Sequence, residues 1–214
     1  MSRSLLCYGD SNTHGTAPMA ALGDLDRFGR DLRWTGHLAE GLSPEWEVIE
    51  AGHPGRTTLH DDPIEGPHRN GLRILPAVLE SHRPLDLVIL MLGTNDLKGR
   101  FSVNATDIAL SLEKLISAIR ASGAGPDGEA PEVLLVAPPP IEETGCLAGI
   151  FAGGAIKSRQ LCARLAEAAR RADVPFVDAG DHIAVSPLDG VHYEEDAHAV
   201  LGQALLRAVR HHFG

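Results

Sequence analysis

The chain has 214 residues, of which 43% are hydrophobic, and carries a formal net charge of −10 at pH 7. This length suits one domain with a substantial core, and the hydrophobic content excludes a disordered chain. The negative charge disfavours nucleic acid and anionic membranes as partners, and no apolar run approaches the ~20 residues of a membrane span.

The cysteine content indicates a reducing compartment. Cys7, Cys146 and Cys162 are an odd number of cysteines and lack the spacing of a metal site. We therefore expect three reduced thiols in a cytoplasmic protein. The first residues lead directly into an apolar stretch and contain no signal-peptide h-region, so we expect no secretion signal.

The predicted elements alternate between strands and helices along the chain. Apolar runs predict strands at residues 4–8, 46–51, 85–92, 132–137 and 174–178. Helical spacing and stop signals predict helices at 33–41, 70–81, 103–121, 155–172 and 194–211. Gly41 is expected to close the first helix, and Pro76 lies inside the second. Residues 16–32 and 141–154 are predicted as long connections.

This alternation predicts a parallel, doubly wound α/β sheet. The run at 85–92 is apolar throughout, as expected for a central strand that is buried on both faces. Ligands bind beyond the carboxyl ends of the strands in such sheets. Ser11, Gly55 and Asn95 follow the first three strands, and Asp189 and His192 follow the last. All five residues are therefore expected at one edge of the sheet.

A serine, an imidazole and a carboxylate are the groups that nucleophilic acyl transfer requires. Ser11 lies in a turn after the first strand, where its hydroxyl faces the edge of the sheet, and a helix N-cap is its alternative role. Asp189 and His192 supply the acid and the base, with a turn acid and a surface histidine as the alternative. A second Asp/His cluster, formed by Asp178, Asp181 and His182, competes with this pair.

A metal or nucleotide site is the other chemistry to weigh. The loop after the second strand contains His53, His60, Asp61, Asp62 and His68, but their spacing matches no compact zinc motif. Neither a G-x-G-x-x-G motif nor a P-loop occurs in the chain. We expect no metal and no cofactor.

Four sequence blocks resemble those of the GDSL/SGNH hydrolase family, in the same order along the chain. The blocks are Gly9-Asp10-Ser11-Asn12, the glycine block at residues 52–58, Gly93-Thr94-Asn95-Asp96, and Asp189-x-x-His192. The resemblance implies a single hydrolase domain over residues 1–214. It also implies a flavodoxin-like three-layer α/β/α sandwich with a five-stranded parallel sheet in the order 2-1-3-4-5.

The resemblance also implies a role for each matching residue. Ser11 would be the nucleophile, His192 the general base and Asp189 the residue that orients the imidazole. The backbone N–H groups of Ser11 and Gly55 and the side chain of Asn95 would form an oxyanion hole. The residues expected on the substrate side are Asn12, His14 and Thr94.

Further residues resemble the bacterial aryl esterase/acyltransferase branch of the family, among them Arg33-Trp34-Thr35-Gly36 and Pro138-Pro139-Pro140. The branch implies a serine esterase for short-chain aryl or alkyl esters, with acyltransferase or perhydrolase side activity. A carbohydrate acetylesterase and a non-catalytic binding module are the alternatives. Asn12 and His14 depart from the branch, which usually has leucine and tryptophan there.

The expected partners are a small-molecule ester and further copies of the chain. The long loops suggest a homo-oligomer, because long ordered loops often serve binding or assembly. The residues expected to supply an apolar contact between copies are Phe28, Leu147, Ile150 and Phe151.

Overall fold

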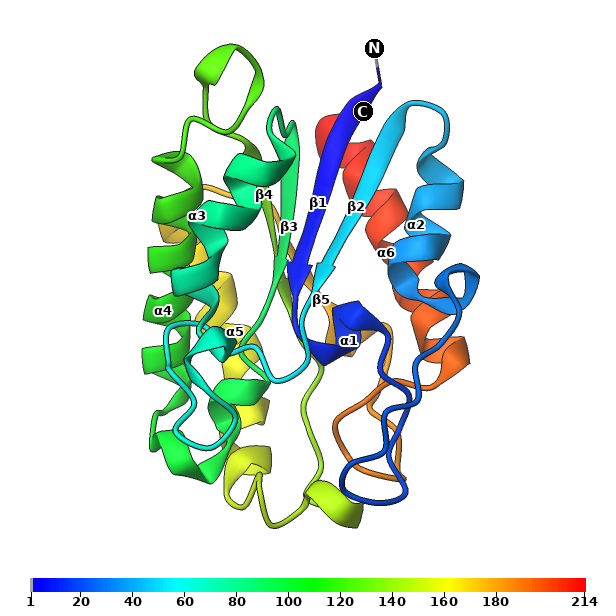
Figure 1. Cartoon of the computed structure of the whole chain (residues 1–214), viewed down its shortest axis with the longest axis vertical. Coiled ribbons are helices and arrows are strands. Elements are labelled where there is room, and N and C mark those ends of the chain that lie inside the picture. The colour runs from blue at the N-terminus through cyan, green and yellow to red at the C-terminus, as the bar shows by residue number, and fades with distance from the viewer. Residues whose placement is uncertain (1) are drawn as a thin grey trace.

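A five-stranded parallel sheet forms the centre of the computed structural model, which describes residues 2–214 (Figure 1). The sheet has the order β2-β1-β3-β4-β5, as the sequence resemblance implies. The strands are β1 (Arg3–Gly9), β2 (Trp46–Gly52), β3 (Leu87–Met91), β4 (Glu132–Ala137) and β5 (Phe176–Asp178). All neighbouring strands pair in parallel, which confirms the predicted α/β class.

Helices cover both faces of the sheet and complete three layers (Figure 1). On one face lie α2 (Trp34–Leu42) and α6 (Glu195–Phe213). The other face is covered by α3 (Gly71–His82), α4 (Ala105–Arg120) and α5 (Gly154–Ala172). A sixth, very short helix, α1 (Ser11–His14), lies at the carboxyl end of the sheet.

The alternation of side chains along β3 divides the core in two. Val88 and Leu90 pack under α3, α4 and α5, whereas Leu87, Ile89 and Met91 face α2 and α6. All five are buried, so each contributes roughly 1.5–3 kcal/mol of burial free energy. A strand with both faces covered in this way must be apolar throughout, which is why its sequence shows no polar alternation.

Neighbouring residues in the sequence determine where α4 begins. Asn104 caps α4: its side chain accepts hydrogen bonds from the N–H groups of Thr106 at 2.8 Å and Asp107 at 3.0 Å. Asp107 accepts the N–H of Asn104 in return, at 3.0 Å, which completes a capping box. The helix therefore begins at Ala105, two residues after the predicted start.

Gly41 has a different role from the predicted one. It does not close α2, which continues to Leu42. A Cβ atom on Gly41 would lie 2.4 Å from Cδ2 of Leu206 on α6. Gly41 is thus a packing residue that lets α2 and α6 approach closely. The sequence of α2 alone cannot show this role, because it depends on a contact with another helix.

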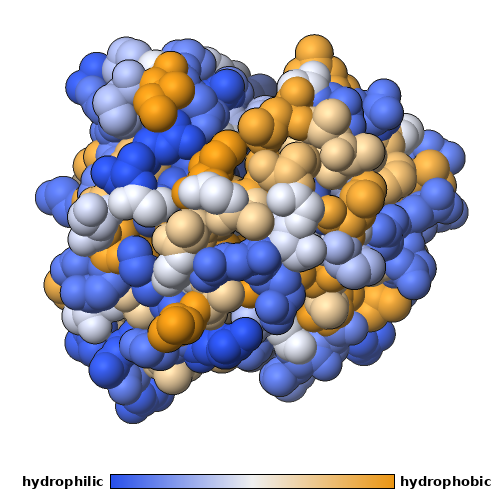
Figure 2. Space-filling view, turned by 90° about the horizontal axis from the view of Figure 1, so that it is seen from below, coloured by the Kyte–Doolittle hydropathy of each residue, from blue (hydrophilic) through white to orange (hydrophobic). Residues whose placement is uncertain are grey.

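The carboxyl ends of the five strands lie at the lower end of the molecule in Figure 1, together with α1 and the long loops. Figure 2 looks onto this end and shows apolar side chains gathered among hydrophilic ones. Residues 16–32 form the expected long connection, with a single turn of 3-10 helix at Arg30–Leu32.

Candidate active site

Ser11 lies in a tight turn between β1 and α1. A Cβ atom on Gly9 would lie 2.0 Å from Oγ1 of Thr13, so only glycine allows the chain to turn this sharply. Asp10 caps α1 by accepting the N–H of Asn12 at 3.0 Å. The cap is therefore Asp10, and the side chain of Ser11 makes no hydrogen bond to residues 2–214.

Asp189 and His192 form a hydrogen-bonded pair in the loop before α6. Nδ1 of His192 lies 2.6 Å from Oδ2 of Asp189, which also accepts the N–H of Met19 at 2.8 Å. The N–H groups of Val191 and His192 bind Oδ1, each at 2.9 Å. Burial would raise the pKa of Asp189, but these hydrogen bonds and the His192 charge outweigh burial and lower it to about 2. Asp189 is therefore ionised and holds the imidazole in a fixed orientation.

A hydrogen bond across 179 residues of sequence fixes the serine turn relative to the histidine loop. Nδ2 of Asn12 donates to the carbonyl of Val191 at 3.1 Å, and Nε1 of Trp34 donates to the carbonyl of Asn12 at 3.1 Å. Asn12 is 1% exposed. The predicted contact between Asn12 and substrate stays a prediction. Nδ2 of Asn12 is bound inside the protein, whereas its Oδ1 makes no hydrogen bond within residues 2–214.

Gly55 and Asn95 carry the candidate oxyanion donors. Nδ2 of Asn95 donates to Oδ2 of Asp10 at 3.3 Å, which places the amide beside the serine turn. Among residues 2–214, the backbone N–H groups of Ser11 and Gly55 make no backbone hydrogen bond. Thr94 is 3% exposed and does not line the cavity described below, and its predicted contact with substrate stays a prediction. Thr94 instead starts the turn that presents Asn95.

Two buried side chains tie the loop after β2 to the sheet. Arg56 donates to the carbonyls of Gly9, at 2.7 Å, and Ala51, and its guanidinium lies 4.1 Å from the Tyr8 ring centroid. Asp96 accepts hydrogen bonds from the N–H and hydroxyl of Thr58. Burial raises the pKa of Asp96 to about 7, against the opposing effect of the Thr58 hydrogen bonds. Both contacts are structural, since neither Arg56 nor Asp96 lines the cavity.

A cavity of about 470 Å³ brings Ser11, Gly55, Asn95 and His192 together. One part of its wall is apolar, and the other part is polar and charged. The apolar wall comprises Met19, Leu22, Leu25, Leu147, Ile150 and Phe151. His14 and a charged group, Glu65, Arg69 and Lys98, form part of the polar wall.

Several solved structures of known proteins have the same fold as this chain. An aryl esterase from M. smegmatis matches with 42% identity and a TM-score of 0.93, covering 98% of this chain and 99% of that one. A carbohydrate acetylesterase from Sinorhizobium meliloti matches with 39% identity and a TM-score of 0.93, covering 99% and 100%. A lipase/acylhydrolase from Enterococcus faecalis, at 20% identity and a TM-score of 0.67, shares the fold. A search of curated proteins finds no significant match.

The model of the GDSL-like lipase/acylhydrolase family matches residues 7–200, which is most of the chain. The chain belongs to the GDSL-like lipase/acylhydrolase family. This GDSL-like hydrolase is an esterase, as its family and its solved neighbours show. Its sheet and helices have the SGNH hydrolase fold that the sequence blocks imply.

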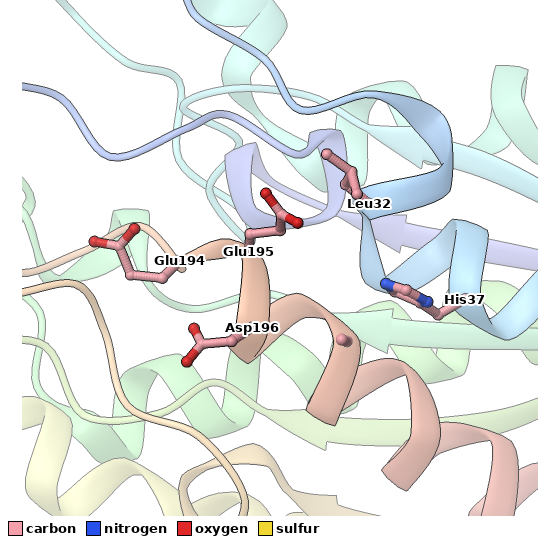
Figure 3. A pocket seen from close by; sticks show the side chains of 6 residues that line it. Leu32, His37, Glu194, Glu195 and Asp196 are labelled. Atoms are coloured by element: carbon pink, nitrogen blue, oxygen red, sulfur yellow. The ribbon is translucent and has the colours of Figure 1, made fainter.

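A second hollow of the GDSL-like hydrolase, about 510 Å³ in volume, lies at the start of α6. Figure 3 shows three acidic side chains there, Glu194, Glu195 and Asp196, which point in different directions, with His37 on the opposite wall. It contains neither a serine nor a paired histidine, so it does not compete with the first cavity.

The alternative Asp/His cluster of the hydrolase lies away from the cavity. Asp178 accepts the Cys162 thiol at 2.6 Å and the N–H of Gly180 at 2.8 Å, and none of Asp178, Asp181 and His182 lines the cavity. In the part of the chain that the structure describes, no three His, Cys, Asp or Glu side chains are placed to hold a metal ion. Likewise, none of the described helices is long and apolar enough to cross a membrane.

From the sequence, several of the residues that line the cavity of the hydrolase are not assigned to the site, and others are given a different role. Met19 and the charged group of Glu65, Arg69 and Lys98 lie in loops without a recognisable motif. Leu147, Ile150 and Phe151 were expected at an interface between copies, but they line the cavity. Phe28 packs its ring on His198, with the centroids 5.4 Å apart. Apolar residues in a loop give the same sequence pattern whether they line a cavity or contact another protein chain.

Proposed function

We propose that the protein is a serine esterase that hydrolyses short-chain aryl or alkyl esters through an acyl-Ser11 intermediate. The observation that carries this proposal is the convergence of Ser11, the Asp189-bound His192 and the free Gly55 N–H on one cavity. Ser11 is the nucleophile, His192 the general base and Asp189 the residue that orients and stabilises the imidazolium.

Acylation begins when the Ser11 hydroxyl attacks the ester carbonyl and Nε2 of His192 takes its proton. The hydrogen bond between Nδ1 of His192 and Asp189 leaves Nε2 as the nitrogen that faces the reaction. The carbonyl oxygen becomes negatively charged, and the N–H groups of Ser11 and Gly55 and the Asn95 amide stabilise it. The tetrahedral intermediate then releases the alcohol, which takes the proton from His192.

Deacylation repeats these steps with water. His192 takes a proton from water, the hydroxide attacks the acyl carbon, and Ser11 leaves with the proton that His192 returns. Serine, imidazole and oxyanion donors supply every step of this cycle, so we propose that no cofactor or metal takes part. The rate should be unchanged by a chelator.

The cavity supports a small acyl group and leaves two classes of alcohol open. Its apolar wall suits an aryl or alkyl ester, in line with the aryl esterase neighbour. The charged group of Glu65, Arg69 and Lys98 could bind the hydroxyls of a sugar, which favours a carbohydrate acetylesterase as the second candidate. The complete catalytic set disfavours a non-catalytic binding module.

Covalent trapping and a substrate panel test the proposal together. An organophosphonate should label the protein once, and peptide mapping should place the label on Ser11. Activity on p-nitrophenyl esters should fall as the acyl chain lengthens, because the cavity holds only about 470 Å³ and bulky side chains such as Phe151 occupy part of its wall. Acetylated xylan in the same panel separates the two candidates. A protein that neither reacts with the phosphonate nor cleaves any ester would refute both.

We further propose that hydrolysis prevails over acyl transfer more than in relatives with tryptophan at position 14. His14 lines the cavity, and burial, with Arg27 and Arg33 nearby, lowers its pKa, so its imidazole is neutral and can hydrogen-bond water. His14→Trp should exclude water and raise the ratio of benzyl acetate to acetic acid formed from vinyl acetate and benzyl alcohol. An unchanged ratio would show that water reaches the acyl-serine by another route.

We also propose a cytoplasmic homo-oligomer. The three cysteines are free, which suits a reducing compartment. Leu25, Ile64 and Leu22 are 91%, 77% and 63% exposed, and they offer the apolar contact that the buried Phe151 and Leu147 cannot. Light scattering at micromolar concentration should give a multiple of 22.8 kDa. A mass of one chain would contradict this assembly.

A further inference from the structure

The proposed oxyanion donor Gly55 lies in a turn that can exist in two forms. The N–H of Arg56 donates to the carbonyl of His53 at 3.1 Å, and Gly55 has φ +73°. Proline at the second position, followed by a glycine with positive φ, is the pattern of a type II turn. Type I and type II turns differ by a flip of the central peptide, which here joins Pro54 to Gly55.

The orientation of this one peptide decides whether the Gly55 N–H can serve the reaction. In a trans peptide the C=O and the N–H point in opposite directions, so a flip would exchange the two. Pro54 is compatible with both turn types, and a glycine can adopt the φ of either. The local sequence therefore favours the type II orientation without locking it, and a contact from elsewhere can supply the lock.

Arg69 makes that contact. Its NH1 group donates to the carbonyl of Pro54 and lies 3.0 Å from Nε2 of His53. Burial, with Arg56 and Arg69 nearby, lowers the pKa of His53 to about 4, so its imidazole is neutral and accepts this hydrogen bond. One guanidinium nitrogen thus binds two consecutive residues of the turn.

An ion-pair network holds Arg69 in place. Nε of Arg69 lies 3.4 Å from Oε2 of Glu65, whose Oε1 binds Nζ of Lys98 at 2.5 Å. The ion pair packs directly on the turn, since a Cβ atom on Gly55 would lie 2.5 Å from Oε2 of Glu65 and 3.1 Å from Nε of Arg69. The Lys98 side chain is only 6% exposed, so solvent screens this part of the network weakly.

We propose that Arg69 is a positioning residue that locks the Pro54–Gly55 peptide with its N–H directed at the substrate oxygen. The inference rests on the proposed role of Gly55. A charged donor on the Pro54 carbonyl also polarises the peptide, which strengthens the hydrogen bond that the Gly55 N–H gives to a developing oxyanion. Arg69 acts through this peptide, and its contribution appears in the transition state.

The first test compares Arg69→Met with Arg69→Lys. Removal of one oxyanion donor lowers kcat by about 10²–10³, so loosening the peptide in Arg69→Met should lower kcat by about 10–100-fold. KM should change by less than about threefold, because the ground-state carbonyl gains little from this donor. Arg69→Lys retains one donor but not the fork, and it should restore part of kcat. Arg73→Met is the matched control, since Arg73 makes an exposed ion pair with Asp61, and it should leave both constants unchanged.

A thionoester substrate distinguishes a positioning role of Arg69 from a merely structural one. Its sulfur is a poor acceptor, so the ratio of oxoester to thionoester kcat/KM reports how well the oxyanion donors engage. This ratio should fall in Arg69→Met in proportion to kcat. General damage to the site would lower both rates equally and leave the ratio unchanged.

Each remaining outcome decides the proposal. An unchanged kcat in folded Arg69→Met, or a loss confined to KM, would overturn it, and the latter would place Arg69 in substrate binding. If Arg69→Met does not fold, Arg69→Lys carries the test, and wild-type values of kcat and of the ratio in Arg69→Lys would overturn the inference. If the wild-type protein cleaves no ester, the proposed function fails instead, which distinguishes the two failures.

Discussion

Ser11→Ala is expected to lower kcat for p-nitrophenyl acetate by on the order of 10⁴–10⁶, because it removes the hydroxyl that we propose as the nucleophile. The Ser11 side chain makes no hydrogen bond within residues 2–214, and Asp10 provides the cap of α1. The substitution should therefore leave the thermal unfolding midpoint nearly unchanged. Steady-state kinetics and a circular dichroism melt measure the two effects, and full activity in Ser11→Ala would remove the assignment of the nucleophile.

His192→Ala should produce a loss of similar size, because the general base is removed from both half-reactions. Asp189 keeps three backbone N–H donors, from Met19, Val191 and His192, so its carboxylate stays satisfied. The matched control is His182→Ala, taken from the alternative Asp/His cluster that does not line the cavity. The assignment of His192 as the general base requires wild-type activity in His182→Ala and loss of activity in His192→Ala. The reverse pattern would place the base elsewhere.

Asn95→Ala is expected to lower kcat by about 10²–10³ and to leave KM nearly constant. Asp10 accepts one N–H of the Asn95 amide at 3.3 Å, which leaves the second N–H for the oxyanion. The amide bond to the substrate strengthens only as charge develops on the oxygen, so the loss should appear in kcat. A loss confined to KM would instead place Asn95 in ground-state binding.

Asn104→Ala provides the control for Asn95→Ala. Asn104 is the N-cap of α4 and does not line the cavity. Its removal should reduce the free energy of unfolding by about 0.5–2 kcal/mol, as for other N-caps, and leave kcat unchanged. The pair of variants therefore separates loss of stability from loss of oxyanion binding. A fall in kcat that matches the fall in stability in both variants would contradict the role of Asn95.

The fold and much of the site could be predicted because they depend on local patterns. The apolar run of β3 and the alternation of strands and helices are each visible in short stretches of sequence. A parallel sheet then brings the strand ends to one edge, so Ser11, Gly55 and Asn95 could be placed together without knowing any distance. The pairing of Asp189 with His192 is what the resemblance of Asp189-x-x-His192 to a family block implies, and the two side chains are hydrogen-bonded.

The sequence by itself determined the fold class and which loops carry the candidate chemistry. Only the tertiary structure decided the bond from Asn12 to Val191, the packing of Gly41 on Leu206 and the reach of Arg69 to Pro54. Each of these depends on how closely two separate segments approach and which way a side chain or peptide points. Such approach distances arise from the packing of whole helices, strands and loops, whereas a local sequence pattern records only the propensity and polarity of its own segment.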